Sequence, residues 1–174
     1  MTDKQLALKP FDFVLAVKIG VNPQEDFRFA RLAEIFGVSL STIHGAIKRA
    51  EAARILSRSA GSVRAINSAV REFAIHGAKY AFPATTGPST RGIPTAIGAP
   101  ILAQHFESTT ALVPVWPSPD GRSFGFELVP LHPSVPRAAQ DDEALYAVLA
   151  LVDAVRAGAA REREIAITEL QARL

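Results

Sequence analysis

Basic side chains are concentrated in one short part of the chain, between residues 39 and 64. Five lysines and arginines occur there against a single acidic residue, Glu51. Lysine and arginine neutralise phosphate oxygens, so the chemistry predicted for this segment is contact with a polyanion. Several short hydroxyl side chains and one imidazole accompany the cations. The five basic residues are Lys48, Arg49, Arg54, Arg58 and Arg64.

The charge of the whole chain gives no such signal. The 174 residues contain 19 lysines and arginines and 17 aspartates and glutamates, for a formal net charge of +2. Residues 1–66 carry ten basic groups against six acidic ones, and residues 140–174 carry four against seven. The excess is therefore local, which favours one polyanion-binding surface over a generally basic protein.

Composition sets the class of protein. Hydrophobic residues make up 48% of the chain, which indicates a folded globular protein. The absence of cysteine excludes disulfides and thiolate metal sites. The longest apolar run, near residues 144–152, is far shorter than the roughly 20 residues that cross a bilayer, and the N-terminus has no signal-peptide pattern. We therefore expect a cytoplasmic protein that does not engage a membrane.

Three helices and a hairpin are predicted to position the basic segment. The first helix is expected from Pro10 to about Ile19, and the second over residues 29–36, where Gly37 ends it. Ser39 is placed to cap a third helix that continues to about Arg54. Two short apolar runs, on either side of a Ser-Ala-Gly-Ser stretch at residues 59–62, predict a small β-hairpin.

Helical spacing predicts which side of the third helix faces outward. When its aliphatic residues Ile43, Ala46, Ile47 and Ala50 pack inward, the polar residues lie on the opposite face or on the flanks. A glycine in the middle of a helix costs roughly 1 kcal/mol relative to alanine. The presence of Gly45 in the middle of the helix therefore requires an explanation, and close approach of the helix to a DNA groove is one.

Residues 37–56, GVSLSTIHGAIKRAEAARIL, resemble the recognition helix of winged helix-turn-helix regulators of the MarR and DeoR kind in bacteria. Ala33 lies four residues before Gly37, and Ile43 six residues after it, which is the spacing of such hairpins. The resemblance covers about the first two-fifths of the chain. It departs from the family in the wing, which is short and has only Arg58 and Arg64 near its tip.

The resemblance implies a sequence-specific regulator that binds double-stranded DNA, and we expect a repressor. The helix at residues 39–54 would enter the major groove, and the hairpin would contact neighbouring phosphates. Hydroxyl and imidazole groups would read base edges, and cations would bind phosphates. The residues expected at the DNA are Ser39, Ser41, Thr42, His44, Gly45, Lys48, Arg49, Arg54, Arg58 and Arg64.

The fold class expected is α+β, with a winged helix-turn-helix domain at residues 1–66 and a second α+β region at residues 67–174. Ten of the twelve prolines lie in residues 81–137, which predicts strands and loops there. Strands are expected at residues 112–116 and 124–129. Residues 67–76 are expected to form a helix that Asn67 caps and Gly77 stops.

The stretch TTGPSTRGIPTAIG, residues 85–98, is expected to be a loop. Gly87 and Gly92 have the separation found in phosphate-binding loops, but Ile93-Pro94 stand where Lys-Ser/Thr would be needed. Nucleotide hydrolysis is excluded on that ground. The loop could instead contact a partner or an anion through Arg91, or simply connect elements.

Two further helices are expected at residues 141–156 and 160–174. The first has apolar residues on nearly all sides, so it forms either a central core or an interface between subunits. Regulators that read two half-sites act as dimers, and this helical pair is one place for a homodimer interface. Burial within one subunit is the alternative, and the sequence does not separate the two.

No catalytic or metal-binding arrangement is present in the sequence. The four histidines, at positions 44, 76, 105 and 132, are scattered, and no H-E-x-x-H, G-x-S-x-G or G-x-G-x-x-G motif occurs. The acidic residues at 141–143 suit the first turn of a helix. We therefore expect no enzyme activity, no metal and no cofactor.

Two other functions remain open at this stage. The protein could be an antitoxin-like or other protein-interaction module whose C-terminal region binds a partner. It could also be a ligand-responsive sensor with a pocket formed by His76 and Tyr80 in the aromatic segment 73–83, together with the 85–98 stretch. The alternative for that segment is a structural one, in which it seals the N-terminal part against the rest.

Overall fold

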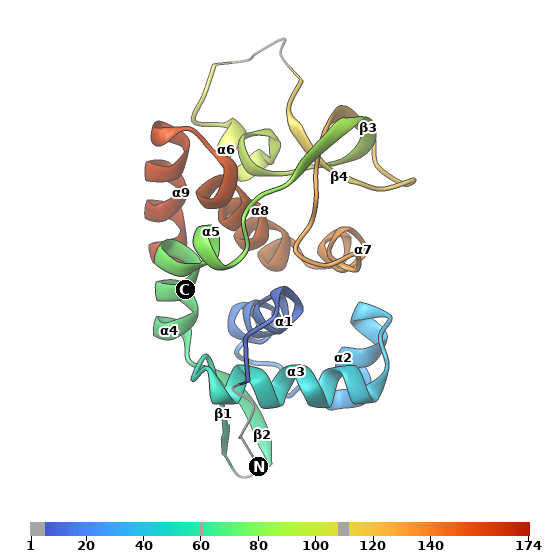
Figure 1. Ribbon diagram of the computed structural model, residues 1–174, viewed down its shortest axis with the longest axis vertical. Coiled ribbons are helices and arrows are strands. Elements are labelled where there is room, and N and C mark those ends of the chain that lie inside the picture. Colours follow the sequence, from blue (N-terminus) through green and yellow to red (C-terminus); the bar gives the residue numbers. More distant parts are fainter. Residues whose placement is uncertain (1–5, 60, 108–111) are drawn as a thin grey trace.

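The protein is an α+β structure in which two small sheets lie at the periphery of a group of helices (Figure 1). The computed structural model describes residues 6–59, 61–107 and 112–174. The N-terminal elements are α1 (Pro10–Val21), α2 (Phe29–Phe36), α3 (Leu40–Ala52), β1 (Leu56–Ser59) and β2 (Ser62–Ala65). The later elements are α4 (Asn67–Glu72), α5 (Ala78–Ala81), β3 (Thr86–Pro94), α6 (Pro100–Ala103), β4 (Pro114–Pro117), β5 (Ser123–Leu128), α7 (Val135–Gln140), α8 (Glu143–Ala157) and α9 (Ala160–Arg173).

The turn between α2 and α3 has the predicted chemistry. Gly37 has a φ of +61° and closes α2, because its N–H donates to the Glu34 carbonyl and the next N–H donates to the Ala33 carbonyl. The Ser39 hydroxyl accepts the Thr42 N–H at 3.1 Å and so caps α3. Strands β1 and β2 form the predicted antiparallel hairpin.

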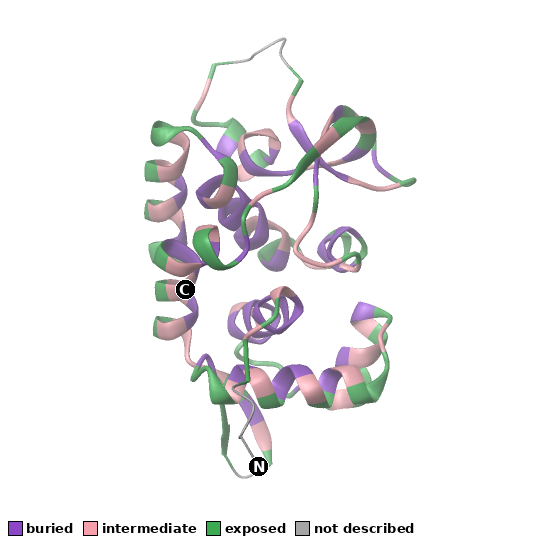
Figure 2. Ribbon diagram, in the orientation of Figure 1, coloured by how far each residue is buried: buried purple, intermediate pink, exposed green. Residues whose placement is uncertain are grey.

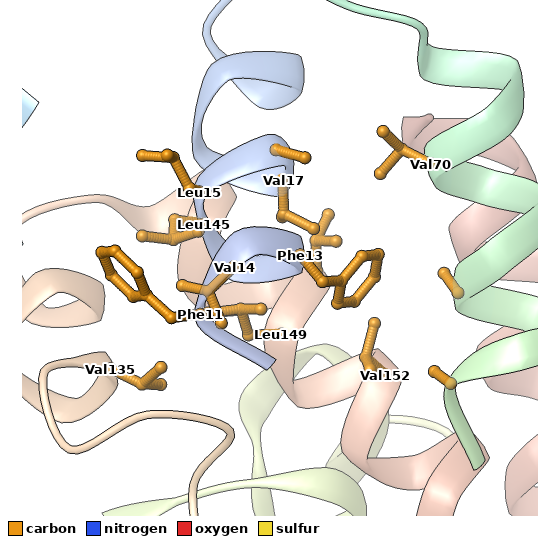
Figure 3. Close-up of a cluster of buried hydrophobic side chains, with 14 of the residues drawn as sticks. Phe11, Phe13, Val14, Leu15, Val17, Val70, Val135, Leu145, Leu149 and Val152 are labelled. Atoms are coloured by element: carbon orange, nitrogen blue, oxygen red, sulfur yellow. The ribbon is translucent and has the colours of Figure 1, made fainter. Parts of the chain in front are cut away.

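Helix α1 lies at the centre of the molecule, between α2 and α3 on one side and α7 and α8 on the other (Figure 1). Every residue from Phe11 to Gly20 is buried, so α1 has no solvent-facing stripe. Phe11 and Val14 point toward Leu145 and Leu149 of α8 (Figure 3). One continuous hydrophobic cluster therefore includes side chains from both halves of the chain.

Two ion pairs fasten α1 to its neighbours. The fully buried Asp12 carboxylate accepts hydrogen bonds from Arg49 Nε and Nη2 of α3, both at 2.7 Å. Near the other end of α1, Lys18 Nζ lies 2.6 Å from Asp142, whose carboxylate also caps α8 by accepting the Leu145 N–H at 2.9 Å. Each buried charge thus has its counter-charge, which burial of such groups requires.

Strand β3 occupies residues that we expected to be a loop, so that expectation was wrong. It pairs antiparallel with both β4 and β5, and the three strands close into a small barrel. Glycines on β3 and β5 are needed because the backbones of the three strands come unusually close to one another. A Cβ on Gly92 would lie 2.1 Å from the Trp116 carbonyl oxygen, and one on Gly125 would lie 2.0 Å from the Val113 carbonyl oxygen.

A buried aspartate attaches this barrel to α8. Asp153 Oδ2 accepts hydrogen bonds from Trp116 Nε1 at 2.6 Å and from Thr95 Oγ1 at 2.8 Å, and Oδ1 accepts one from Arg156 Nη1 at 2.6 Å. Arg156 Nε also donates to the Phe82 carbonyl at 2.7 Å. This network connects β4, the residue that follows β3, α8 and the segment that follows α5.

The middle of the chain departs from the expectations in three further ways. The helix that begins at Asn67 does not stop at Gly77 but continues through a π-helical turn at Phe73–Gly77 into α5. The Asn67 side chain does not cap it and instead donates to the Gly20 carbonyl at 3.2 Å. Helices α6 and α7 were not predicted, because the proline-rich region was expected to contain only strands and loops. In both helices the proline lies in the first turn, where its missing N–H costs nothing.

The two C-terminal helices are present, and their apolar side chains are used within the chain. Residues Leu145 to Val155 of α8 are almost all buried, and α9 packs on α8 through Ala166 and Leu170. The structure therefore favours burial within one subunit as the reason for the apolar character of α8. In the described part of the chain, no helix combines the length and apolar character needed to span a bilayer.

Gly92→Ala is expected to lower the free energy of unfolding by about 3 kcal/mol, because the added methyl group would collide with backbone atoms that cannot move independently. Gly87→Ala in the same strand is the matched control, since its methyl group would mainly displace the flexible carboxylate end of Glu127. Urea denaturation of both variants measures the difference. Equal stabilities would contradict the close strand approach.

The stability of the protein should depend on the ionisation of Asp142. Burial alone would raise the pKa of this carboxyl group, but hydrogen bonds from Lys18, the Leu145 N–H and Asn22 outweigh burial and hold its pKa below the ordinary value. The resulting stabilisation is present above the unfolded-state pKa of about 3.9 and is lost as the pH falls through the lower folded-state value.

Asp142→Asn should therefore lower the free energy of unfolding by about 3 kcal/mol at pH 7, because it leaves Lys18 buried without its anion. The variant should also lose stability less steeply than the wild type between pH 4 and pH 2. Urea denaturation at a series of pH values tests both points. Asp141→Asn, at the exposed neighbouring residue, should match the wild type at pH 7.

Candidate nucleic-acid interface

The outer face of α3 and the β1–β2 hairpin lie together at one end of the molecule (Figure 1). As predicted, Ile43, Ala46, Ile47 and Ala50 are fully buried. The opposite side of the helix is therefore turned away from α1, and exposed residues follow it (Figure 2). The exposed polar residues of this side are Ser41, His44 and Lys48.

Hydroxyl groups cluster at the start of α3. The Ser39 hydroxyl caps the helix and lies 2.8 Å from Ser41 Oγ and 2.9 Å from Thr42 Oγ1. Ser39 and Thr42 are thus engaged in shaping the N-terminus of the helix, and Thr42 is only half-exposed. Ser41 is exposed, and its hydroxyl can still take a further hydrogen bond.

Arg49 and Gly45 have structural roles that the sequence interpretation missed. The Arg49 guanidinium lies on Asp12, and this hydrogen-bonded anion raises the pKa of Arg49 above its ordinary value. A Cβ on Gly45 would lie 3.2 Å from Arg49 Nη1, so the glycine leaves space for the guanidinium one helical turn later. Close approach to a groove is therefore not needed to explain Gly45.

Lys48 and Arg54 are cations without a carboxylate partner among residues 6–59, 61–107 and 112–174. Both are exposed. Arg54 also has a φ of +57°, where it follows the end of α3 and the Ile55 N–H returns to the Ala50 carbonyl at 3.1 Å. A side chain other than glycine costs about 1 kcal/mol in this left-handed conformation.

The two arginines of the hairpin are exposed but anchored. Arg58 on β1 makes an ion pair with Glu51 of α3, with its Nε 3.2 Å from Oε1. Arg64 on β2 donates through Nη1 to the Pro23 carbonyl at 2.8 Å. Each guanidinium has further N–H groups beyond those used in these contacts. The hairpin is therefore held against the loop before α2 and against α3.

Phe29 is a residue of this surface that sequence reasoning did not identify. Its ring centroid lies 4.6 Å from that of His44, and Arg58 Cζ lies 5.6 Å from the same ring. The three residues are 14 or more positions apart in the sequence, so no local spacing could reveal the contact. Asp12 offered a weak signal, as the single acidic residue of a mostly apolar helix.

The structure does not assemble the sensor pocket expected from His76 and Tyr80. Both residues are exposed, and Tyr80 retains 74% of its accessible surface. Phe73 and Phe82 instead pack together, with ring centroids 5.6 Å apart, and Phe73 lies 5.1 Å from Phe13 of α1. Phe73 and Phe82 therefore cover the hydrophobic core, which is the structural role that the alternative predicted for this segment.

A hollow of about 610 Å³ lies elsewhere, between α6, α8 and α9. Its lining includes Ala144 and Tyr146, and neither His76 nor Tyr80 takes part. Within the described ranges, no group of three or more histidine, aspartate or glutamate residues is arranged to hold a metal ion. Comparisons of the chain with protein-family models, curated proteins and solved structures found no match.

Arg49→Ala should lower the free energy of unfolding by about 3 kcal/mol, because it leaves the Asp12 carboxylate buried without its cation. Lys48→Ala, one residue earlier in the same helix, should change it by less than about 0.5 kcal/mol. Thermal or urea denaturation distinguishes the structural role of Arg49 from the surface position of Lys48. A destabilisation by Lys48→Ala as large as that by Arg49→Ala would contradict the assignment.

Proposed function

We propose that the protein is a sequence-specific transcriptional regulator that binds double-stranded DNA through α3 and the β1–β2 hairpin. The observation that carries the proposal is the arrangement of α3, whose aliphatic side is fully buried while its opposite side presents Ser41, His44 and Lys48 next to exposed arginines. The order of three helices followed by an antiparallel hairpin supports a winged helix-turn-helix.

In this proposal α3 lies in the major groove and the hairpin is the wing. Ser41 and His44 contact base edges, since short donors and acceptors can read the pattern of the groove. Lys48, Arg54, Arg58 and Arg64 bind phosphates. Ser39, Thr42, Gly45 and Arg49 act indirectly, because they cap α3 or fix it on α1.

Arg54 provides independent support for phosphate binding. Glycine is the favoured residue in its left-handed conformation, and an arginine there lowers stability without any partner for its charge in the described part of the chain. A side chain that costs folding energy and makes no internal ion pair is explained by contact with an external anion. The position of Arg54, between α3 and the hairpin, suits the DNA backbone.

We further propose a homodimeric repressor in which residues 67–174 supply dimerisation. Occupying a promoter is sufficient to repress it, and reading two half-sites requires two copies of α3. Because the apolar residues of α8 are covered within the chain, a dimer would use side chains that are exposed in the single chain. Exposed apolar side chains outside the core include Phe124 on β5, at 63% of its accessible surface.

Binding to labelled duplexes, measured by fluorescence anisotropy, tests the proposal. Lys48→Ala and Arg54→Gly should weaken binding to all sequences alike and reduce the slope of log affinity against log salt by about 1 each. Arg54→Gly should at the same time stabilise the fold by about 1 kcal/mol, so lower affinity cannot arise from unfolding. Arg122→Ala, at an exposed cation in the turn between β4 and β5, is the control.

The same assay separates base reading from phosphate binding. With a duplex selected from a randomised library, Ser41→Ala and His44→Ala should reduce the preference for the selected sequence by about 1–3 kcal/mol each, with little effect on a scrambled duplex. If all four variants bind both duplexes as the wild type does, the proposed interface is wrong.

A further inference from the structure

Phe29 occupies the point where α2, α3 and the hairpin meet. It is the first residue of α2 and is half-buried. The His44 ring meets it at an interplanar angle of 75°, in the edge-to-face geometry that aromatic rings prefer, with the centroids 4.6 Å apart. Arg58 of β1 lies over the same ring at 5.6 Å, within the range of a cation–π contact.

Arg58 is also held from the other side. Its Nε and Nη2 approach the two Glu51 oxygens at 3.2 and 3.3 Å, so the guanidinium is fixed between a carboxylate of α3 and the Phe29 ring. The Nη1 group takes no part in these contacts and remains available for a phosphate. The hairpin is thereby tied to α2 and α3 through one side chain.

We propose that Phe29 is a positioning residue for DNA recognition, which holds His44 and Arg58 in place before DNA binds. The inference rests on the proposed function. Ordering a flexible side chain at an interface costs binding free energy, so a side chain that is already fixed contributes more. Because His44 belongs to the base-reading set and Arg58 to the wing, Phe29 also fixes the wing relative to α3.

The test replaces the ring and measures sequence preference. Phe29→Leu should reduce the ratio of affinities for the selected and scrambled duplexes about fivefold, as expected for the loss of an aromatic pair. Phe29→Tyr retains the ring and should retain the ratio. Phe106→Leu is the matched control and should have no effect, because this phenylalanine also has an arginine over its ring, with Arg161 Cζ 5.6 Å from the centroid.

If Phe29 had only a structural role, Phe29→Leu would lower the affinity for both duplexes equally. An unchanged ratio of affinities would therefore overturn the inference, while the proposal that the protein binds DNA would stand. Phe29→Met, whose unbranched and flexible side chain can adapt to the space left by the ring, is measured in parallel in case the leucine variant does not fold. In the free wild-type protein, NMR should show the chemical shifts of the His44 ring protons displaced by the Phe29 ring current. In Phe29→Leu and Phe29→Met this displacement should be absent. A wild-type protein that binds no duplex at low salt would overturn the proposed function together with the inference.

Discussion

The arrangement of the molecule depends on the complete burial of α1 and on the two ion pairs that its charged residues make. A buried charge without its partner lowers the free energy of unfolding by several kcal/mol. Asp12 therefore requires a cationic neighbour, and Lys18 requires an anionic one. Arg49 meets that requirement from α3, and Asp142 meets it from the start of α8. Hydrophobic contacts are non-directional, so by themselves they do not determine how α3 and α8 are oriented on α1. The ion pairs favour one orientation of each helix.

The Asp12 pair also determines how the cations of α3 are divided. Arg49 turns toward α1, and Gly45 leaves the guanidinium room to do so. The neighbouring Lys48 lies about 100° further round the helix and faces solvent. Two adjacent basic residues thus have separate tasks, one in seating the helix and one on the surface that we propose meets DNA. Counting basic residues in a segment does not distinguish such roles.

The features that sequence analysis predicted are those with local signals. Gly37, Ser39 and the aliphatic spacing of α3 act within a few residues of themselves, and the structure confirms each. The missed features depend on distant partners or on unusual composition. Arg49 pairs with a residue 37 positions earlier, Phe29 contacts two other elements, and β3 is a strand in spite of its glycines and prolines because close strand approach demands small residues. The DNA-binding function, the dimer and the division into two domains remain predictions.

The sharing of α1 bears on how the protein can be divided. In many regulators a DNA-binding unit has its own core and can be moved from one protein to another. Here Phe11 and Val14 find part of their apolar environment in α8, more than a hundred residues later in the chain (Figure 3). Separating the first 66 residues would expose that side of α1 to water, so a transplanted fragment would need a substitute for the apolar surface that α8 provides.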